Sequence, residues 1–417
     1  MFKKAHLQNA IPVVMEKTGG VRSVCLGIWV KVGSRNEPPG KNGISHFLEH
    51  MFFKGTGKRT AEGIAVEVDS MGGDFNAFTS KETTTFYIKV LDEYLDKAVE
   101  LITDVFVHSA FPEEEVEKEK GVIKEEIKSV EDTPDDYVHD LFSRDIWGEA
   151  GLGQPVLGRR DTVKSFTKED IMAYVSRYYG AGNIVVSCAG SFEPVGLLDA
   201  LNRHMGRLKG GEATGAGGPP AFRSGLNLHE REHSEVHLCL GVQGIPQASP
   251  DRYSVAILNT ILGAGISSRL FQEIREKRGL AYTIHSFLVG YLDTGLWGVY
   301  AGTGRKRLGE VAGLVMDELR RLPGSITPAE LERAKKQLKG NLILSLESTS
   351  SRMQNIARQE MYYGRYFGTE DVIRAVEAVS LDDLSVLSER LLRGKTAALT
   401  VLGPVEKTAL KTVDLSL

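Results

Sequence analysis

The order of secondary-structure signals in the first half of this 417-residue chain recurs in the second half. In the first half, an alternating apolar run at 24–32 is followed by helical patterns, two extended stretches and a long charged helix that begins after Pro112. In the second half, an apolar run at 236–242 leads through helical patterns and two extended stretches to a helix that begins at Pro328. Alternation with a period of two residues is typical of strands, whereas apolar residues three and four apart are typical of helices. The chain is therefore predicted to be a divergent tandem repeat of two α/β halves of about 200 residues each.

A stretch rich in glycine and proline separates the two halves. Residues 210–220 read Gly-Gly-Glu-Ala-Thr-Gly-Ala-Gly-Gly-Pro-Pro and form the only low-complexity segment of the sequence. Such a composition is typical of a linker between domains. We therefore predict an N-terminal domain at 1–209, a linker at 210–224 and a homologous C-terminal domain at 225–417.

The charge balance argues against a nucleic-acid-binding protein. With 51 basic and 55 acidic residues the chain has a formal net charge of -4, whereas the neutralisation of phosphates needs a basic surface. No run of about 18 apolar residues is present that could span a bilayer. The N-terminus also lacks the apolar segment of a secretory signal. We therefore expect no membrane partner and a cytoplasmic location.

The cysteines are consistent with a reducing compartment. Cys25, Cys188 and Cys239 are odd in number, and their spacing fits no common metal site. Cys188 and Cys239 lie in apolar runs that are typical of strands. We therefore expect buried free thiols.

Residues 43–53 form an apolar stretch with a helical pattern that carries two histidines and one carboxylate. His46 and His50 are four residues apart and would lie on one face of a helix, with Glu49 beside them. Two imidazoles in this arrangement can hold a zinc ion, and a nearby carboxylate can accept a proton from a water molecule. The alternative is a buried amphipathic helix whose histidines are satisfied by ordinary hydrogen bonds.

A catalytic zinc ion bound by two histidines needs a third protein ligand. Candidates lie at 119–127, where Glu119 and Glu126 are seven residues apart and share one helix face. The alternative is a solvated helix with surface acids. When the two halves are aligned, Ala334 and Asn341 replace these carboxylates, so any metal chemistry is expected in the first half.

Together these residues resemble a known family. The sequence His46-Phe47-Leu48-Glu49-His50, followed 76 positions later by Glu126, resembles the inverted motif of the pitrilysin/insulinase zinc metallopeptidases. The resemblance is strongest to the processing-peptidase-like branch, which contains the mitochondrial processing peptidase and its bacterial homologues. It extends from about Leu7 to Pro404, including residues 53–56, 76–80 and 275–282.

The resemblance implies an α+β fold with two homologous halves, each a mainly antiparallel sheet flanked by helices, as in LuxS-like and processing-peptidase-like proteins. The whole chain would form half of a clamshell. One zinc ion per chain would be bound by His46, His50 and Glu126. Glu49 would act as the general base, and Glu119 would be a catalytic-site acid that orients a ligand histidine.

The resemblance also implies two sets of substrate-binding residues. Asn76, Ala77, Phe78 and Thr79 match an edge strand to which an extended peptide adds; the alternative is a plain β-hairpin arm. Arg275 and Tyr282 match a pair from the C-terminal half that binds substrate near the metal; the alternative is a charged helix end before Gly279.

The function implied is that of a zinc-dependent endopeptidase that hydrolyses unfolded peptides, for processing or clearance, inside a closed dimer chamber. The partner would be a second copy of the chain or a paralogous subunit, with Arg275 and Tyr282 acting in trans. The alternatives are a non-catalytic scaffold or helper subunit of the same family, and a zinc hydrolase with a non-peptide substrate. The glycine-rich loop of the mitochondrial helper subunit is reduced here to residues 262–266.

Overall fold

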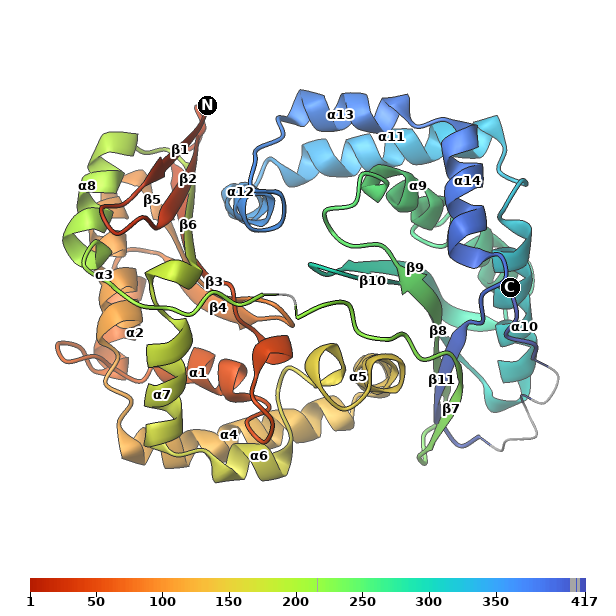
Figure 1. Cartoon of the computed structure of the whole chain (residues 1–417), viewed down its shortest axis with the longest axis horizontal. Helices are drawn as coiled ribbons and strands as arrows, with labels where there is room; N and C mark the ends of the chain where they lie inside the picture. The colour runs from red at the N-terminus through yellow and green to blue at the C-terminus, as the bar shows by residue number, and fades with distance from the viewer. Residues whose placement is uncertain (216, 406–409, 411–412) are drawn as a thin grey trace. The chain divides into compact units, whose positions relative to one another are not determined.

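The computed structural model describes residues 1–215, 217–405, 410 and 413–417, which divide into two compact units (Figure 1). Unit 1 comprises Met1–Lys128, Gln154–Gly215 and Ser345–Tyr366. Unit 2 comprises Ser129–Gly153, Ala216–Leu344 and Phe367–Leu417. Each unit contains one sheet flanked by helices, which confirms the predicted α+β class with two halves.

The sheet of unit 1 has the strand order β1-β2-β6-β3-β5-β4. β2 pairs with β6 in parallel, and the other neighbours are antiparallel. The strands are β1 (Phe2–His6), β2 (Pro12–Lys17), β3 (Ser23–Val30), β4 (Asp74–Thr79), β5 (Thr84–Leu91) and β6 (Ile184–Gly190). The helices are α1 (Ile44–Phe52), α2 (Ala61–Ser70), α3 (Leu95–His108), α4 (Glu113–Glu131, whose last turn falls in unit 2), α6 (Arg160–Ser165), α7 (Lys168–Tyr178), α8 (Pro194–Met205) and α12 (Thr349–Tyr363).

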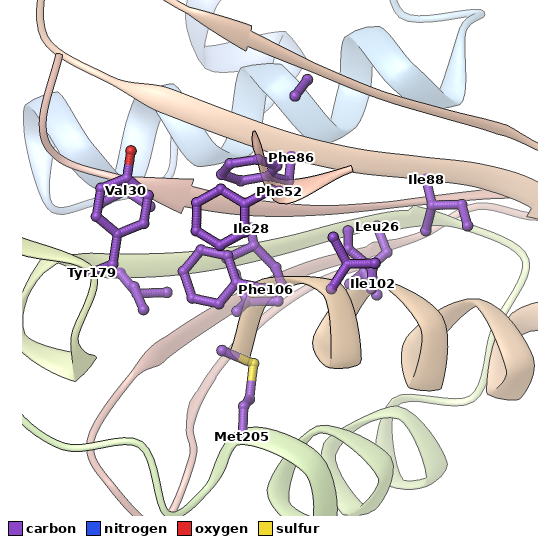
Figure 2. Close-up of a cluster of buried hydrophobic side chains, with 14 of the residues drawn as sticks. Leu26, Ile28, Val30, Phe52, Phe86, Ile88, Ile102, Phe106, Tyr179 and Met205 are labelled. Atoms are coloured by element: carbon purple, nitrogen blue, oxygen red, sulfur yellow. The ribbon is translucent and has the colours of Figure 1, made fainter. Parts of the chain in front are cut away.

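One face of this sheet packs against α1, α3 and α8 in a large apolar core (Figure 2). Phe52, from the last turn of α1, is 1% exposed. Its ring lies 4.7 Å from that of Phe86, 5.7 Å from that of Phe106 and 5.5 Å from that of Tyr179. Burying one such ring stabilises the fold by roughly 3–5 kcal/mol relative to alanine, so these contacts fix α1 against the sheet.

The opposite face of the same sheet is covered by α12, a helix from the second half of the sequence (Figure 1). Met353 and Ile356 of α12 pack in one buried cluster with Val14, Trp29 and Val185 from the strands. Because both faces are covered, β3 and β6 are buried along almost their whole length, which explains their continuous apolar sequences.

The sheet of unit 2 has the order β7-β11-β8-β10-β9, with β7 and β11 parallel and the other neighbours antiparallel. It repeats the order β2-β6-β3-β5-β4 of unit 1, including the single parallel pair at the same place. The strands are β7 (Gly225–Glu230), β8 (Val236–Gly244), β9 (Ala281–Gly290), β10 (Gly295–Thr303) and β11 (Ala398–Gly403). The helices are α5 (Pro134–Trp147), α9 (Arg252–Leu262), α10 (Leu308–Arg321), α11 (Pro328–Ser345), α13 (Thr369–Ala378) and α14 (Leu381–Leu392).

One face of the second sheet is covered by α5, which comes from the first half of the sequence. Val138 and Phe142 of α5 lie in one buried cluster with Cys239, Tyr300 and Leu402. Each half of the sequence therefore gives one helix to the sheet of the other. The compact units differ in this respect from the contiguous division that the sequence predicts, because periodicity identifies a helix but not the sheet that it covers.

The predicted linker is bound to both units in its described part. Gly182 N donates to Gly210 O at 3.1 Å, and Glu212 N donates to Arg177 O at 2.8 Å, both in unit 1. Arg223 N donates to Ile146 O at 2.9 Å in unit 2. Residue 216 of the linker lies outside the described residues. The glycine-rich composition thus coexists with defined backbone hydrogen bonds.

All three cysteines are buried and free, as predicted. Within the described ranges, no helix combines the length and the apolar character that crossing a membrane requires.

Candidate metal centre

The start of α1 is fixed by a buried carboxylate that does not belong to the helix. Glu37 accepts hydrogen bonds from Gly43 N at 2.7 Å, Ser45 N at 2.9 Å and Asn42 Nδ2 at 2.9 Å. Burial raises the pKa of Glu37 to about 7, against the opposing effect of these donors. Gly43 itself has φ +93°, and a Cβ there would lie 2.6 Å from Gly158 Cα. Glu37 therefore satisfies N–H groups that a helix start leaves open.

His46 and His50 lie one turn apart on α1, with ring centroids 4.6 Å apart. Glu126 of α4 approaches both rings: its Oε2 lies 3.6 Å from His46 Nε2 and 3.7 Å from His50 Nε2. In the part of the chain that the structure describes, this is the one group of at least three histidine, cysteine or acidic side chains that could hold a metal ion. The helical spacing read from the sequence thus brings the three predicted ligands together.

The donor set and its geometry fit zinc. A tetrahedral zinc ion with bonds of about 2.0–2.1 Å separates its ligand atoms by about 3.3–3.4 Å, close to the separations between Glu126 and the two rings. Glu126 Oε2 is buried and has no hydrogen-bond partner among the described residues, which is costly unless a cation lies nearby. Two histidines and one glutamate are a ligand set of catalytic zinc sites, which keep a fourth position open.

The electrostatics favour neutral imidazole at one ligand. Burial, and then the charge of His50, lower the pKa of His46 to about 3, so His46 is neutral and can bind a metal. Burial would also lower the pKa of His50, but the hydrogen bond and charge of Glu119, with the charges of Glu126 and Glu49, raise it. Burial raises the pKa of Glu126. A bound cation would offset the negative charge of the closely spaced carboxylates of Glu49, Glu119 and Glu126.

Glu119 lies behind His50 and is only 2% exposed. Its Oε1 lies 2.6 Å from His50 Nδ1, and its Oε2 lies 2.5 Å from Lys54 Nζ. Burial acts to raise the pKa of Glu119, but the hydrogen bonds from His50 and Lys54 outweigh it and lower the pKa. An anionic Glu119 accepts a hydrogen bond from the Nδ1–H of His50, which leaves Nε2 as the metal-binding atom.

Glu49 is held by the strand next to the helix. Thr79 Oγ1, at the end of β4, donates to Glu49 Oε2 at 2.6 Å. Burial raises the pKa of Glu49 despite this hydrogen bond. The sequence placed Thr79 in a peptide-binding strand and gave no sign of this contact, because the two residues are 30 positions apart and on different elements.

The structure places Asn76, Ala77, Phe78 and Thr79 in β4, the edge strand of the sheet. Only β5 pairs with β4 among the described strands. Ala77 is buried, Asn76 is exposed and Phe78 packs edge-on against Trp29 at 5.6 Å. The strand thus forms one arm of a hairpin and also has an open edge.

Arg275 and Tyr282 lie in unit 2, at a short π-helical turn (Phe271–Glu276) and at the start of β9. The Arg275 guanidinium lies 4.9 Å from the centre of the Phe271 ring and 5.0 Å from that of Tyr282, which is 78% exposed. Lys277 and Arg278 both pair with Glu273, whereas Arg275 has no carboxylate partner among the described residues. Arg275 therefore differs from the other charges of this helix end.

Comparison with protein families supports the same chemistry. The family model described as insulinase (peptidase family M16) matches residues 12–160, and the model described as the peptidase M16 inactive domain matches residues 165–338. The chain belongs to the insulinase peptidase family, M16. The M16 relatives include an uncharacterized zinc protease of Bacillus subtilis, 41% identical over 97% of this chain and 98% of the relative. A further uncharacterized zinc protease, from Streptomyces coelicolor, is 38% identical over 97% of this chain and 90% of the relative.

Solved structures show the same M16 fold. A protease from Helicobacter pylori has a TM-score of 0.88 and 24% identity, over 97% of this chain and 99% of that chain. A peptidase M16 inactive domain from Pseudomonas fluorescens has a TM-score of 0.91 and 20% identity, over 97% and 98%. A chain of complex III2 from Candida albicans has a TM-score of 0.84 and 20% identity, over 97% of both chains. The fold thus occurs both in a protease and in a chain of complex III2, so the fold alone does not decide the function.

Proposed function

We propose that this M16 chain is a zinc-dependent endopeptidase that hydrolyses unfolded peptides, with one zinc ion per chain. The observation that carries the proposal is that His46, His50 and Glu126 converge. Beside them lies a further carboxylate, Glu49, which is not one of the three candidate metal ligands. A scaffold protein has no need for a buried Glu126 oxygen without a partner or for an oriented second carboxylate.

His46 and His50 would bind zinc through Nε2, and Glu126 through Oε2. Zinc bound there would lower the pKa of a water molecule toward about 7 and polarise the scissile carbonyl group. Glu49, oriented by Thr79, would accept the proton from that water and donate it to the nitrogen of the leaving amine. Glu119 would hold the His50 ring and its tautomer throughout.

The open edge of β4 supports a peptide substrate in an extended conformation. A segment added to this edge would be bound mainly through main-chain hydrogen bonds, with little dependence on sequence. Because Thr79 ends the strand and contacts Glu49, a peptide paired with β4 would pass beside the general base. Only an unfolded segment can pair in this way, which is why we propose unfolded peptides as substrates for processing or clearance.

We further propose that the active form is a closed dimer chamber, in the cytoplasm, formed by two copies of the chain or with a paralogue. Arg275 and Tyr282 would serve the zinc site of the partner subunit. The support is the guanidinium of Arg275, which has no carboxylate partner among the described residues, and the exposed ring of Tyr282; their N–H and O–H donors suit a carbonyl group that gains negative charge.

The competing function is a non-catalytic scaffold or helper subunit, which is favoured by the likeness to a chain of complex III2. Digestion of a peptide library by the purified chain, with and without a chelator, separates the two. We expect cleavage that the chelator abolishes and that zinc restores. Glu49→Gln should bind zinc as the wild type does and lose at least about 100-fold in cleavage rate, since general base catalysis contributes 10²–10⁴-fold. Full cleavage by Glu49→Gln, or by zinc-free protein, would refute the peptidase mechanism.

A further inference from the structure

Lys54 lies four residues beyond His50, in the turn that follows the end of α1, where its backbone N–H donates to Met51 O at 3.2 Å. Its ammonium group contacts the Glu119 oxygen that His50 does not use: Nζ lies 2.5 Å from Oε2, while His50 Nδ1 lies 2.6 Å from Oε1. The Glu119 carboxylate is thus held at one oxygen by a residue of α1 and at the other by a residue of the turn that follows α1.

We propose that Lys54 is a positioning residue of the metal centre, which fixes the Glu119 carboxylate and through it the His50 ring. The inference rests on the proposed zinc site. A carboxylate held at one oxygen can still rotate about its last side-chain bond, whereas a carboxylate held at both oxygens has one orientation. Because Glu119 is almost fully buried, water cannot replace the ammonium group without cost.

The other lysines of this region have a different environment. Lys118 and Lys120 on α4 pair with Glu115 and Glu117, one turn away on the same helix. The Lys118 side chain is 57% exposed, and such an exposed pair contributes little. Lys54 instead joins the turn at the end of α1 to α4 through a buried carboxylate, so it links the end of the helix of His46 and His50 to the helix of Glu126. Lys118→Met removes the same charge without touching this link and is the matched control.

The test is the zinc affinity of the full-length chain, measured by competition with a chromogenic chelator, together with the thermal unfolding of the metal-free protein. We expect Lys54→Met to bind zinc about 10- to 100-fold more weakly, the usual effect of removing a group that supports a metal ligand. Lys54→Arg should recover most of the affinity, and Lys118→Met should bind as the wild type does. Lys54→Gln carries the same expectation if the Met variant does not fold.

A double-mutant cycle separates positioning from general stability. If Lys54 acts through Glu119, then Lys54→Met should change zinc affinity by less than about threefold in a Glu119→Gln background, because the two losses share one path. Additive losses, or wild-type affinity in folded Lys54→Met, would overturn the inference while leaving the peptidase proposal intact. Absence of zinc binding by the wild-type chain would instead refute the metal site itself, and this inference with it.

Discussion

The hydroxyl group of Thr79 donates a 2.6 Å hydrogen bond to Oε2 of Glu49. Thr79 is the last residue of the edge strand β4, and Glu49 lies on α1 between the two histidines. The strand that we propose for peptide binding is therefore joined by one hydrogen bond to the proposed general base.

Replacement of Thr79 by valine should lower kcat while KM stays close to the wild-type value. Valine keeps the shape and the β-branched backbone preference but cannot donate to Glu49, and a hydrogen bond to a charged group contributes roughly 1.5–3 kcal/mol, or about 10- to 100-fold in rate. Thr79→Ser, which keeps the hydroxyl, is the control. Steady-state peptide cleavage measures both constants; an increase in KM alone would mean that Thr79 serves binding rather than the base.

Mixing two inactive variants should restore cleavage if the substrate-binding pair acts in trans. A Glu49→Gln chain keeps Arg275, and an Arg275→Ala chain keeps the base, so a hybrid dimer would contain one complete site. We expect the mixture to reach up to about a quarter of the wild-type rate, since random pairing makes half of the dimers hybrid with one working site each. No recovery, although mass measurements show hybrid dimers, would contradict the arrangement in trans.

The stability of unit 2 should fall as the pH drops below about 6.5, in part because of His139. This residue of α5 lies 3.6 Å from Cys239 Sγ and stacks on Tyr300. Burial, and then the charge of His285, lower the pKa of His139, although Asp136 and Asp135 oppose this. The unfolded chain, with an ordinary histidine pKa of about 6.5, therefore takes up the proton before the folded chain does, and stability is lost as the pH falls.

His139→Gln should show a smaller loss of melting temperature between pH 7 and pH 5.5 than the wild type, both measured without metal. Glutamine cannot take up this proton. His204→Gln, at an exposed position of α8, is the control and should follow the wild-type pH dependence. An unchanged pH dependence in His139→Gln would exclude His139 as a contributor.

Met353→Ala should destabilise unit 1 although Met353 lies in the second half of the sequence. Its side chain is fully buried against the second face of the first sheet, and truncation of such a methionine costs about 2–5 kcal/mol. Arg358→Ala, an exposed position of the same helix, should cost less than about 0.5 kcal/mol. Hydrogen exchange of β3 and β6 amides measures the effect; loss of protection only in unit 2 would contradict the assignment of α12.

Helical spacing constrains the candidate metal ligands locally, and the family resemblance then selects Glu126 rather than Glu119 as the third one. His46 and His50 are one turn apart on one helix, and Glu119 and Glu126 are two turns apart on another, so the approach of these two faces brings the donors together. The repeat likewise predicts two sheets, although the sequence pattern does not predict strands β1, β2 and β7.

Contacts between distant elements could not be predicted in the same way. Glu37 caps α1 from outside the helix, while Gly43 occupies the position where a Ser, Thr, Asp or Asn would have indicated a start. The contacts of Lys54 and Thr79 with carboxylates depend on tertiary packing, which periodicity does not describe. The spacing of four residues between His50 and Lys54 was the one local signal that could have indicated the contact of Lys54 with Glu119.

The exchange of α12 and α5 affects the order in which the chain can fold during synthesis. The first sheet is complete once Gly190 has been made, but the helix that covers its second face ends at Tyr363. At about 5–20 residues per second, that face stays uncovered on the ribosome for roughly 9–35 seconds. During this time Trp29 and Val185 are open to other nascent chains, and domain swapping between two chains becomes a competing outcome. The two halves therefore cannot be expressed, exchanged or inherited as independent modules, since each one carries a helix that the other needs.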